Sequence, residues 1–239
     1  MSIANKMQFL CDGLQRRASK KNMKCLIISG GEFSPVKLNE KYDLIIACDR
    51  GYLYAKKLKI KPDIIVGDFD SSPIPKNINE KISIIKVSSI KDDTDTSLAI
   101  KYALRNGYKN IDIICALGNR LDHTLANIQM MKFIVESGGV CRILSSKVEI
   151  RTLKIGLNKI NKNSKKRNNR ITINSKNTKN KTFSIFSLSD KSKIKHIKGS
   201  KYDIKDITIK NNFPLGVSNE FVKSEVSIYV DSGVVIAVI

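Results

Sequence analysis

Between residues 24 and 145 the sequence alternates between short apolar runs and stretches with helical periodicity. Each apolar run is roughly four to eight residues long and rich in isoleucine, valine and leucine, which is typical of a buried strand. Strands that alternate with helices usually form a parallel sheet with helices on both faces. The pattern therefore predicts a doubly wound, mostly parallel α/β domain. Its expected strands cover 24–29, 42–48, 62–67, 82–88, 110–117 and 140–145, and its expected helices cover 51–60, 94–106 and 121–137.

The pattern changes near residue 148, where helical periodicity ends and short β-branched runs follow one another. Runs such as EIRTLKI, TFSIFSL and EVSIYV are typical of a small antiparallel β-sandwich. The Lys- and Asn-rich stretch at 158–181 has few apolar residues to bury, so we expect a solvated polar loop or long hairpin there. The chain is thus expected to comprise an N-terminal extension (1–22), an α/β domain (23–148) and a β-sandwich domain (149–239).

The charge of the chain has two interpretations. Lysine and arginine number 43 against 22 acidic residues, which gives a formal net charge of +21. Such an excess is typical of nucleic-acid-binding proteins, but it also arises when lysines are spread over solvated surfaces. The basic residues are dispersed along the sequence, aromatic residues make up only 6%, and tryptophan is absent. These observations favour dispersed surface lysines, and we expect no nucleic-acid partner.

Cysteines and apolar segments bear on the cellular compartment. The five cysteines form no CxxC pair, and most of them lie inside expected strands, so they are expected to be core residues in a reducing compartment. No apolar run approaches the ~20 residues that span a bilayer. We therefore expect a cytoplasmic protein without a membrane partner. Residues 1–22 contain several bases and one acid, so an amphipathic helix or an organelle-targeting segment are the alternatives there.

Aspartates follow the ends of several expected strands. They are Asp49 after YDLIIAC, Asp68 and Asp70 after DIIVG, Asp92, Asp93 and Asp95 after ISIIKVSSIK, and Asp122 after IDIICALGNRL. In an open α/β sheet the carboxyl ends of the strands converge on one edge, where ligands bind. Carboxylates gathered there repel one another unless a cation lies among them, and hard divalent cations prefer oxygen ligands. The sequence therefore predicts a site for Mg²⁺ and a nucleotide at this edge.

Each motif at the expected edge also has a structural interpretation. The Asp-x-Asp pair in GDFDS (67–71) could form an ordinary surface turn. Aspartate and threonine in KDDTDT (91–96) are favoured helix caps, although three carboxylates exceed what one cap needs. In GNRLDH (118–123), Arg120 could contact phosphate and Asp122 could orient it, whereas His123 suits a cap or a supporting contact.

Several common nucleotide-site motifs are missing from the sequence. It contains no GxxxxGK[ST] loop, no GxGxxG, no HRD or DFG and no GxSxG. Kinases of the usual γ-phosphate type and dinucleotide enzymes are therefore disfavoured.

Five motifs in one order resemble the thiamine pyrophosphokinase family: CDRG at 48–51, GDFDS at 67–71, KDDTDT at 91–96, GNRLDH at 118–123 and GVSNEF at 216–221. The resemblance covers about residues 24–155 and 182–239. It implies an N-terminal α/β domain, a C-terminal β-sandwich and a homodimer. The implied activity is a Mg²⁺-dependent transfer of pyrophosphate from ATP to the hydroxyl of thiamine, which releases AMP.

The resemblance also implies roles for individual residues. Asp68, Asp70 and Asp95 would hold the metal and its phosphates, and Asp70 or Asp95 would accept the hydroxyl proton. The nucleotide and phosphate groups would meet Asp49, Ser71, Thr94, Thr96, Arg120, Asp122 and His123. Thiamine would meet Lys91, Asp92, Ser218 and Asn219, the last two across the dimer interface.

The chain departs from the family pattern in three places. Arg50 stands where many relatives have a second glycine, no tryptophan is present to stack on thiamine, and the 158–181 stretch has no evident counterpart. Two other functions remain as alternatives. A metal-dependent phosphatase or phosphotransferase phosphorylated on Asp68 would explain GDFDS but not the later motifs. A basic nucleic-acid-binding protein would explain the charge but not the acids at strand ends.

Overall fold

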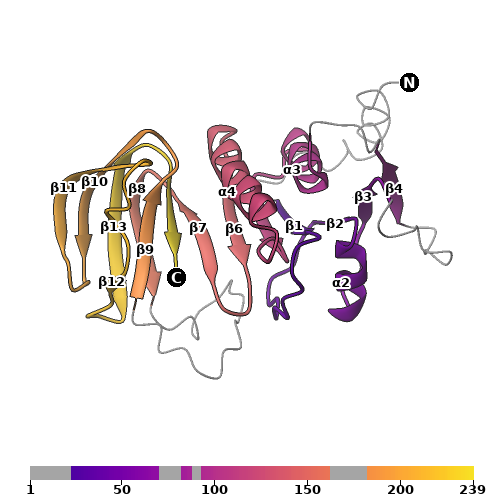
Figure 1. Cartoon of the computed structure of the whole chain (residues 1–239), viewed down its shortest axis with the longest axis horizontal. Coiled ribbons are helices and arrows are strands. Elements are labelled where there is room, and N and C mark those ends of the chain that lie inside the picture. The colour runs from indigo at the N-terminus through magenta and orange to yellow at the C-terminus, as the bar shows by residue number, and fades with distance from the viewer. Residues whose placement is uncertain (1–22, 70–81, 88–92, 162–181) are drawn as a thin grey trace. The chain divides into compact units, whose positions relative to one another are not determined.

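The computed structural model describes residues 23–69, 82–87, 93–161 and 182–239, which form two compact units (Figure 1). Unit 1 contains the described parts of 1–34 and 41–141, and unit 2 contains 35–40 and the described parts of 142–239. None of the helices within these described ranges is long and apolar enough to cross a bilayer.

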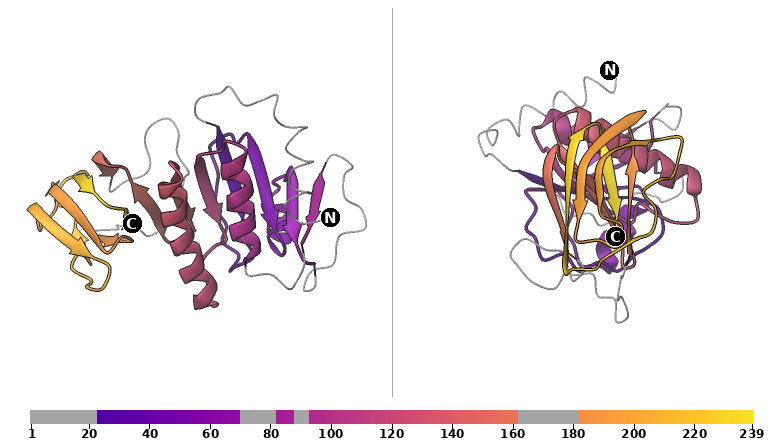
Figure 2. Two further views of the ribbon diagram at one scale, coloured as in Figure 1. Left: turned by 90° about the horizontal axis from the view of Figure 1, so that it is seen from above. Right: turned by 90° about the vertical axis from the view of Figure 1, so that its left-hand side faces the viewer.

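Five parallel strands form the centre of unit 1 in the order β5-β1-β2-β3-β4. They are β1 (Lys24–Ile28), β2 (Leu44–Cys48), β3 (Ile64–Gly67), β4 (Ser83–Lys86) and β5 (Asn110–Ile114). The central strands are mostly apolar because helices cover both faces of the sheet. α3 (Asp95–Arg105) and α4 (Leu121–Glu136) lie together on one side of the strands, and α2 (Gly51–Lys57) lies on the other (Figures 1 and 2).

Short polar signals place the helix ends. Thr94 caps α3, since its hydroxyl oxygen accepts a hydrogen bond from the Ser97 N–H at 3.1 Å. α4 is followed by Gly138 at φ +78°, a left-handed conformation that glycine adopts without steric cost. These ends leave the first turns of α3 and α4 beside the carboxyl ends of the strands.

Unit 2 contains two antiparallel sheets. The boundary between the two units falls inside β6 (Val140–Leu144), after Cys141. β6 pairs in antiparallel orientation with the strand that follows it in the sequence. Within one sheet the order runs β6-β7-β14-β9-β12, with β7 (Glu149–Leu153), β9 (Thr182–Ser187), β12 (Asn219–Glu220) and β14 (Val235–Val238). The other has the order β11-β10-β13-β8, with β8 (Gly156–Asn161), β10 (Lys191–Lys198), β11 (Ile204–Lys210) and β13 (Glu225–Ser232).

A shared apolar core joins the two sheets of unit 2. Phe183 and Ile185 of one sheet and Ile194, Val226 and Ile228 of the other are almost fully buried in it. The rings of Phe183 and Phe221 add an aromatic contact, with centroids 4.9 Å apart. The predicted fold, an α/β domain followed by a β-sandwich, is confirmed.

Two strands of unit 2 differ from the sequence-based expectation. Residues 158–161 were expected to begin the polar loop, but they belong to β8, because Ile160 is buried in the core between polar neighbours. β10 was not predicted, because its sequence KSKIKHIK reads as a solvated lysine run. The remainder of the predicted loop, including the RITIN run, lies outside the described residues.

Candidate functional site

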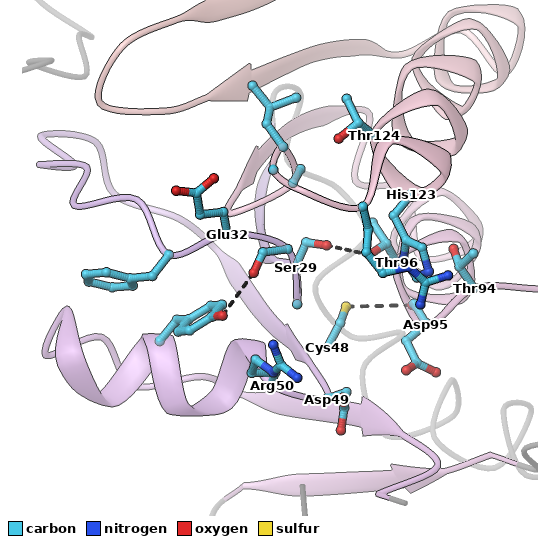
Figure 3. Close-up of a pocket in the computed structure, with 18 of the residues that line it drawn as sticks. Ser29, Glu32, Cys48, Asp49, Arg50, Thr94, Asp95, Thr96, His123 and Thr124 are labelled. Carbon is cyan, nitrogen blue, oxygen red and sulfur yellow. Dashed lines mark hydrogen bonds between the residues drawn. The ribbon is translucent and has the colours of Figure 1, made fainter. Parts of the chain in front are cut away.

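A pocket of about 600 Å³ opens at the carboxyl ends of the parallel strands of unit 1 (Figure 3). Its walls come from the loops after β1, β2, β3 and β5 and from the first turns of α3 and α4. Open α/β sheets bind ligands at this edge because backbone groups and helix N-termini point into the crevice. The pocket is therefore the candidate functional site of unit 1.

Three of the predicted carboxylates line this pocket from three separate elements. Asp49 follows β2, Asp68 follows β3 and Asp95 begins α3. These residues are far apart in the sequence but close in space, because the parallel topology brings neighbouring strand ends side by side. The predicted site residues Asp70, Ser71, Lys91 and Asp92 lie outside the described residues.

The ends of β1, β2 and β3 are packed backbone against backbone. A Cβ atom on Gly51 would lie 2.1 Å from the carbonyl oxygen of Ile28, and one on Gly67 would lie 3.3 Å from the Cα of Asp49. Asp49 itself adopts φ +44°, which is uncommon for a residue other than glycine. The glycines thus allow the turn after β2 to place Asp49 close to the end of β3.

Two aspartates at the start of α3, Asp93 and Asp95, have different surroundings. The Asp93 carboxylate accepts hydrogen bonds from Lys101 Nζ at 2.6 and 2.8 Å and from the Ser97 hydroxyl at 3.1 Å. Asp93 is absent from the pocket lining, whereas Asp95 belongs to it. Asp93 therefore ties the start of α3 to its own second turn, and Asp95 is the carboxylate of this segment that meets the cavity.

A buried hydroxyl pair connects α3 to β1. The Oγ atom of Ser29 lies 2.8 Å from the Oγ1 atom of Thr96, and both side chains line the pocket (Figure 3). Because Ser29 directly follows β1, this contact fixes the N-terminus of α3 against the central strand. Thr96 was expected at the nucleotide site, and its hydroxyl is engaged in this pair.

Sequence reasoning missed the pocket wall formed by the segment after β1. Ser29, Gly30, Gly31, Glu32 and Phe33 all line the cavity. The hydroxyl of Tyr54 on α2 donates to the Gly31 carbonyl oxygen at 2.9 Å, which holds this segment in place. The paired glycines Gly30 and Gly31 after an apolar run were the available signal.

The loop between β5 and α4 brings basic residues to the pocket. Arg120 and His123 line it, together with Thr124. The Arg120 guanidinium donates to both carboxylate oxygens of Asp122, at 2.5 and 3.3 Å, and this hydrogen bonding lowers the pKa of Asp122 to about 2. Asp122 therefore remains ionised at neutral pH and orients the Arg120 side chain, as the sequence suggested for this pair. The side chain of Asp122 is exposed and is not part of the lining.

Ser218 and Asn219 lie in unit 2 and differ in exposure. Ser218 is exposed, adopts φ +57°, and its N–H donates to the Ser184 hydroxyl at 3.0 Å. Asn219 is only 7% exposed. Its Oδ1 accepts from the N–H groups of Tyr202 and Glu220, and its Nδ2 donates to the Ser200 hydroxyl and the Tyr202 carbonyl oxygen. Both polar atoms of the Asn219 side-chain amide are thus engaged, and they join the segment that contains Ser200 and Tyr202 to Glu220.

The carboxylates of the pocket bear on whether it could hold a divalent cation. Within the described ranges, no three histidine, cysteine or acidic side chains are grouped closely enough to form a complete metal site. Mg²⁺, however, commonly binds one or two carboxylates and completes its shell with substrate phosphates and water. Asp49, Asp68 and Asp95 supply hard oxygen donors in one cavity, so the donor set fits a cation that arrives with a polyphosphate.

Two family models match the chain in succession. Residues 36–141 match the model described as thiamin pyrophosphokinase, catalytic domain, and residues 168–235 match thiamin pyrophosphokinase, vitamin B1 binding domain. The chain belongs to the thiamin pyrophosphokinase family. The catalytic-domain match includes the pocket carboxylates and Arg120, and the vitamin B1 binding match includes Ser218 and Asn219.

Individual members of the thiamin pyrophosphokinase family agree with this assignment. Thiamine pyrophosphokinase from Bacillus subtilis is 26% identical over 202 residues, which cover 83% of this chain and 88% of the relative. Thiamin pyrophosphokinase 1 from Caenorhabditis elegans is 24% identical over 183 residues, covering 74% and 70%. The crystal structure of the Bacillus subtilis protein superposes with a TM-score of 0.70 and 23% identity, over 90% of this chain and 97% of that chain. The chain is therefore an enzyme of this family, and the fold is that of its solved members.

Proposed function

We propose that this enzyme transfers the pyrophosphoryl group of ATP to the hydroxyl of thiamine. The observation that carries the proposal is the pocket that Asp49, Asp68 and Asp95 line together with the N-terminus of α3, inside the segment that matches the catalytic domain. The start of a helix attracts phosphate, since its N–H groups and dipole are positive there. Carboxylates and phosphate then share a cavity, which requires a cation between them.

In the proposed reaction the thiamine hydroxyl oxygen attacks the β-phosphorus of ATP. The bond between the β-phosphorus and the oxygen that bridges it to the α-phosphorus breaks, and AMP leaves with that oxygen. The hydroxyl proton passes to a carboxylate, for which Asp95 and Asp70 are the candidates. Arg120, oriented by Asp122, faces the phosphates and offsets their negative charge.

Mg²⁺ would be held by Asp68, Asp95 and Asp70 and would neutralise charge on the phosphate oxygens. We assign nucleotide contacts to Asp49, Thr94, Ser71 and His123. The cation need not be bound before the nucleotide arrives, because the phosphates complete its coordination. The four described cysteines are buried and form no disulfide with one another, which supports a reducing compartment such as the cytoplasm.

We further propose that Ser218 contacts thiamine in a homodimer, in which Lys91 and Asp92 complete the thiamine site. Ser218 follows an exposed apolar stretch in which Phe213 is 62% exposed and Leu215 49%. Exposed apolar residues next to a polar recognition residue are typical of an interface. Asn219 would then support Ser218, because its own amide is already engaged within unit 2.

Replacing Ser218 by alanine should raise the KM for thiamine by about 3- to 10-fold, the scale expected for one lost hydrogen bond. The KM for ATP should change by less than about twofold, because ATP occupies the other part of the site. Steady-state kinetics with each substrate varied in turn measure both values. Ser189→Ala, which removes another hydroxyl of unit 2, is a control. Equal increases in the two KM values would contradict the placement of Ser218 at thiamine.

The products test the proposed reaction. Purified full-length protein is incubated with ATP, Mg²⁺ and thiamine, and the products are identified by mass spectrometry. We expect AMP and thiamine diphosphate in equal amounts. ADP with thiamine monophosphate would show transfer of the γ-phosphate instead, and a phosphoryl group trapped on Asp68 would favour the phosphatase alternative. Either result would overturn the proposal.

A further inference from the structure

The outer face of the four-stranded sheet in unit 2 gathers lysines that are dispersed in the sequence. β11, β10, β13 and β8 lie side by side (Figure 1). One face of these strands supplies Ile194, Ile228 and Ile160 to the core. Because side chains alternate along a strand, the neighbours of these core residues point to the opposite face of the sheet, away from the core. We call this outward-pointing face of β8, β10, β11 and β13 the basic face.

The register of the strands defines the basic face. Across β11 and β10, Lys210 pairs with Lys191 and Thr208 pairs with Lys193. Farther along, Lys198 of β10 pairs with Ser227 of β13, which in turn pairs with Lys159 of β8. Seven lysines of the four strands are exposed: Lys159, Lys191, Lys193, Lys195, Lys198, Lys205 and Lys210.

Rings occupy the middle of the basic face. The register places Lys205, His196, Tyr229 and Leu157 in one row across the four strands. The ring centroids of His196 and Tyr229 are 5.7 Å apart, and the Lys195 ammonium lies 5.6 Å from the centroid of the Tyr229 ring. The two rings therefore lie side by side in this row, with Lys205 at the His196 end and the Lys195 ammonium beside Tyr229.

Acidic residues do not balance these charges. The same four strands carry three acids: Asp206, Glu225 and Asp231. Glu225 forms an ion pair with Lys159 at 2.9 Å. Lysines therefore exceed acids on these strands by seven to three, and the excess is concentrated on β10 and β11.

The sequence, in which the lysines are dispersed, suggested no nucleic-acid partner, but the fold gathers these lysines on one sheet. We propose that the basic face binds single-stranded nucleic acid. A positively charged surface attracts any polyanion, but rings set among the cations specifically suit unpaired bases, which stack on them. A membrane surface would instead require apolar side chains that insert below the headgroups, and Leu157 is the one exposed large aliphatic residue among the described residues of these four strands. The inference is independent of the reaction proposed above, because it involves no residue assigned to thiamine or ATP.

Binding of this kind has a defined physical signature. Lysines that contact phosphates release counterions, so affinity for a single strand falls with salt by a slope of about −0.7 per contact. Binding without base-specific contacts typically has a Kd of roughly 1–100 μM at physiological salt. Stacking on Tyr229 adds an affinity that does not depend on salt.

The test uses full-length protein and a fluorescein-labelled 20-mer of oligouridylate, with anisotropy measured at several salt concentrations. The triple variant K191Q/K193Q/K195Q should weaken binding by at least about tenfold and reduce the salt slope by about 2. Tyr229→Leu should weaken binding by about fivefold without changing the slope. Both variants should keep the activity on thiamine and the melting temperature of the parent protein.

A second triple variant, K59Q/K61Q/K109Q, removes the same charge from exposed lysines of unit 1 and serves as the control. It should lower affinity by less than about threefold. Equal losses in the two triple variants would show that net charge alone drives binding and would overturn the proposal. The absence of binding at 0.1 M salt (about 10 Å screening length), or a preference for anionic phosphatidylserine vesicles over the oligonucleotide, would overturn it as well.

Discussion

Replacing Asp95 by asparagine should lower turnover by more than about 100-fold, the scale seen when one preorganised charged group of an active site is lost. Asp95 begins α3 and lines the pocket together with Asp49 and Asp68. Asparagine keeps the size of the side chain and removes the charge that would hold a cation or accept a proton. Turnover is measured as thiamine diphosphate formed per enzyme at saturating ATP and thiamine.

Asp93→Asn provides a matched control two residues away. Asp93 carries the same chemical group on the same turn, but its carboxylate is bound by Lys101 and Ser97 and does not line the pocket. This variant should keep turnover within about threefold, since a partly exposed ion pair contributes at most about 1 kcal/mol to stability. A large loss in Asp93→Asn with normal turnover in Asp95→Asn would reverse the assignment of the two residues.

Replacing Asn219 by alanine should lower the free energy of unfolding of unit 2 by about 2–3 kcal/mol. The substitution leaves the Tyr202 N–H and carbonyl oxygen without the side-chain partner that the buried Asn219 supplies, at part-buried hydrogen bonds. Unsatisfied buried backbone groups cost more than an exposed hydrogen bond contributes. Urea unfolding followed by circular dichroism measures the change, and hydrogen exchange at 200–203 locates it.

Two further variants separate support from thiamine contact at this position. Glu220→Gln removes only the exposed ion pair with Lys201 and should change stability by less than about 1 kcal/mol. Asn219→Asp keeps the two accepted hydrogen bonds and loses the donated ones. Its free energy of unfolding should therefore lie between those of the parent and of Asn219→Ala. If Asn219→Ala left stability unchanged and raised only the KM for thiamine, Asn219 would be a direct ligand instead.

The α/β fold was predictable because its signals are local. The strands of unit 1 are short and mostly apolar, the helix α3 begins at the threonine cap Thr94, and glycines follow α3 and α4 close to the expected ends. The three acids were predictable for a related reason: in a parallel sheet, position at a strand end in the sequence becomes position at one edge in space.

The remainder depended on contacts between distant residues. Ser29 and Thr96 are 67 positions apart, and nothing near either residue indicates that their hydroxyls pair. The pairing of Asn219 with Tyr202 is likewise set by the antiparallel segments of unit 2. β10 was missed because lysines fill its exposed positions, so that its sequence reads as a solvated run, and because its buried residues Ser192, Ile194 and Ile197 are irregularly spaced.

The most direct measurement is the binding of Mn²⁺ in the presence of α,β-methylene-ATP. In this analogue a methylene group replaces the oxygen between the α- and β-phosphorus, so the bond that the reaction breaks is absent. Electron paramagnetic resonance counts the bound Mn²⁺ in the parent protein, in Asp68→Asn, in Asp95→Asn and in the control Glu136→Gln. We predict that the parent and the control bind Mn²⁺ only together with the nucleotide, and that the two aspartate variants bind it at least about tenfold more weakly. Equal Mn²⁺ binding in all four proteins would contradict the claim that these carboxylates hold a metal-bound triphosphate.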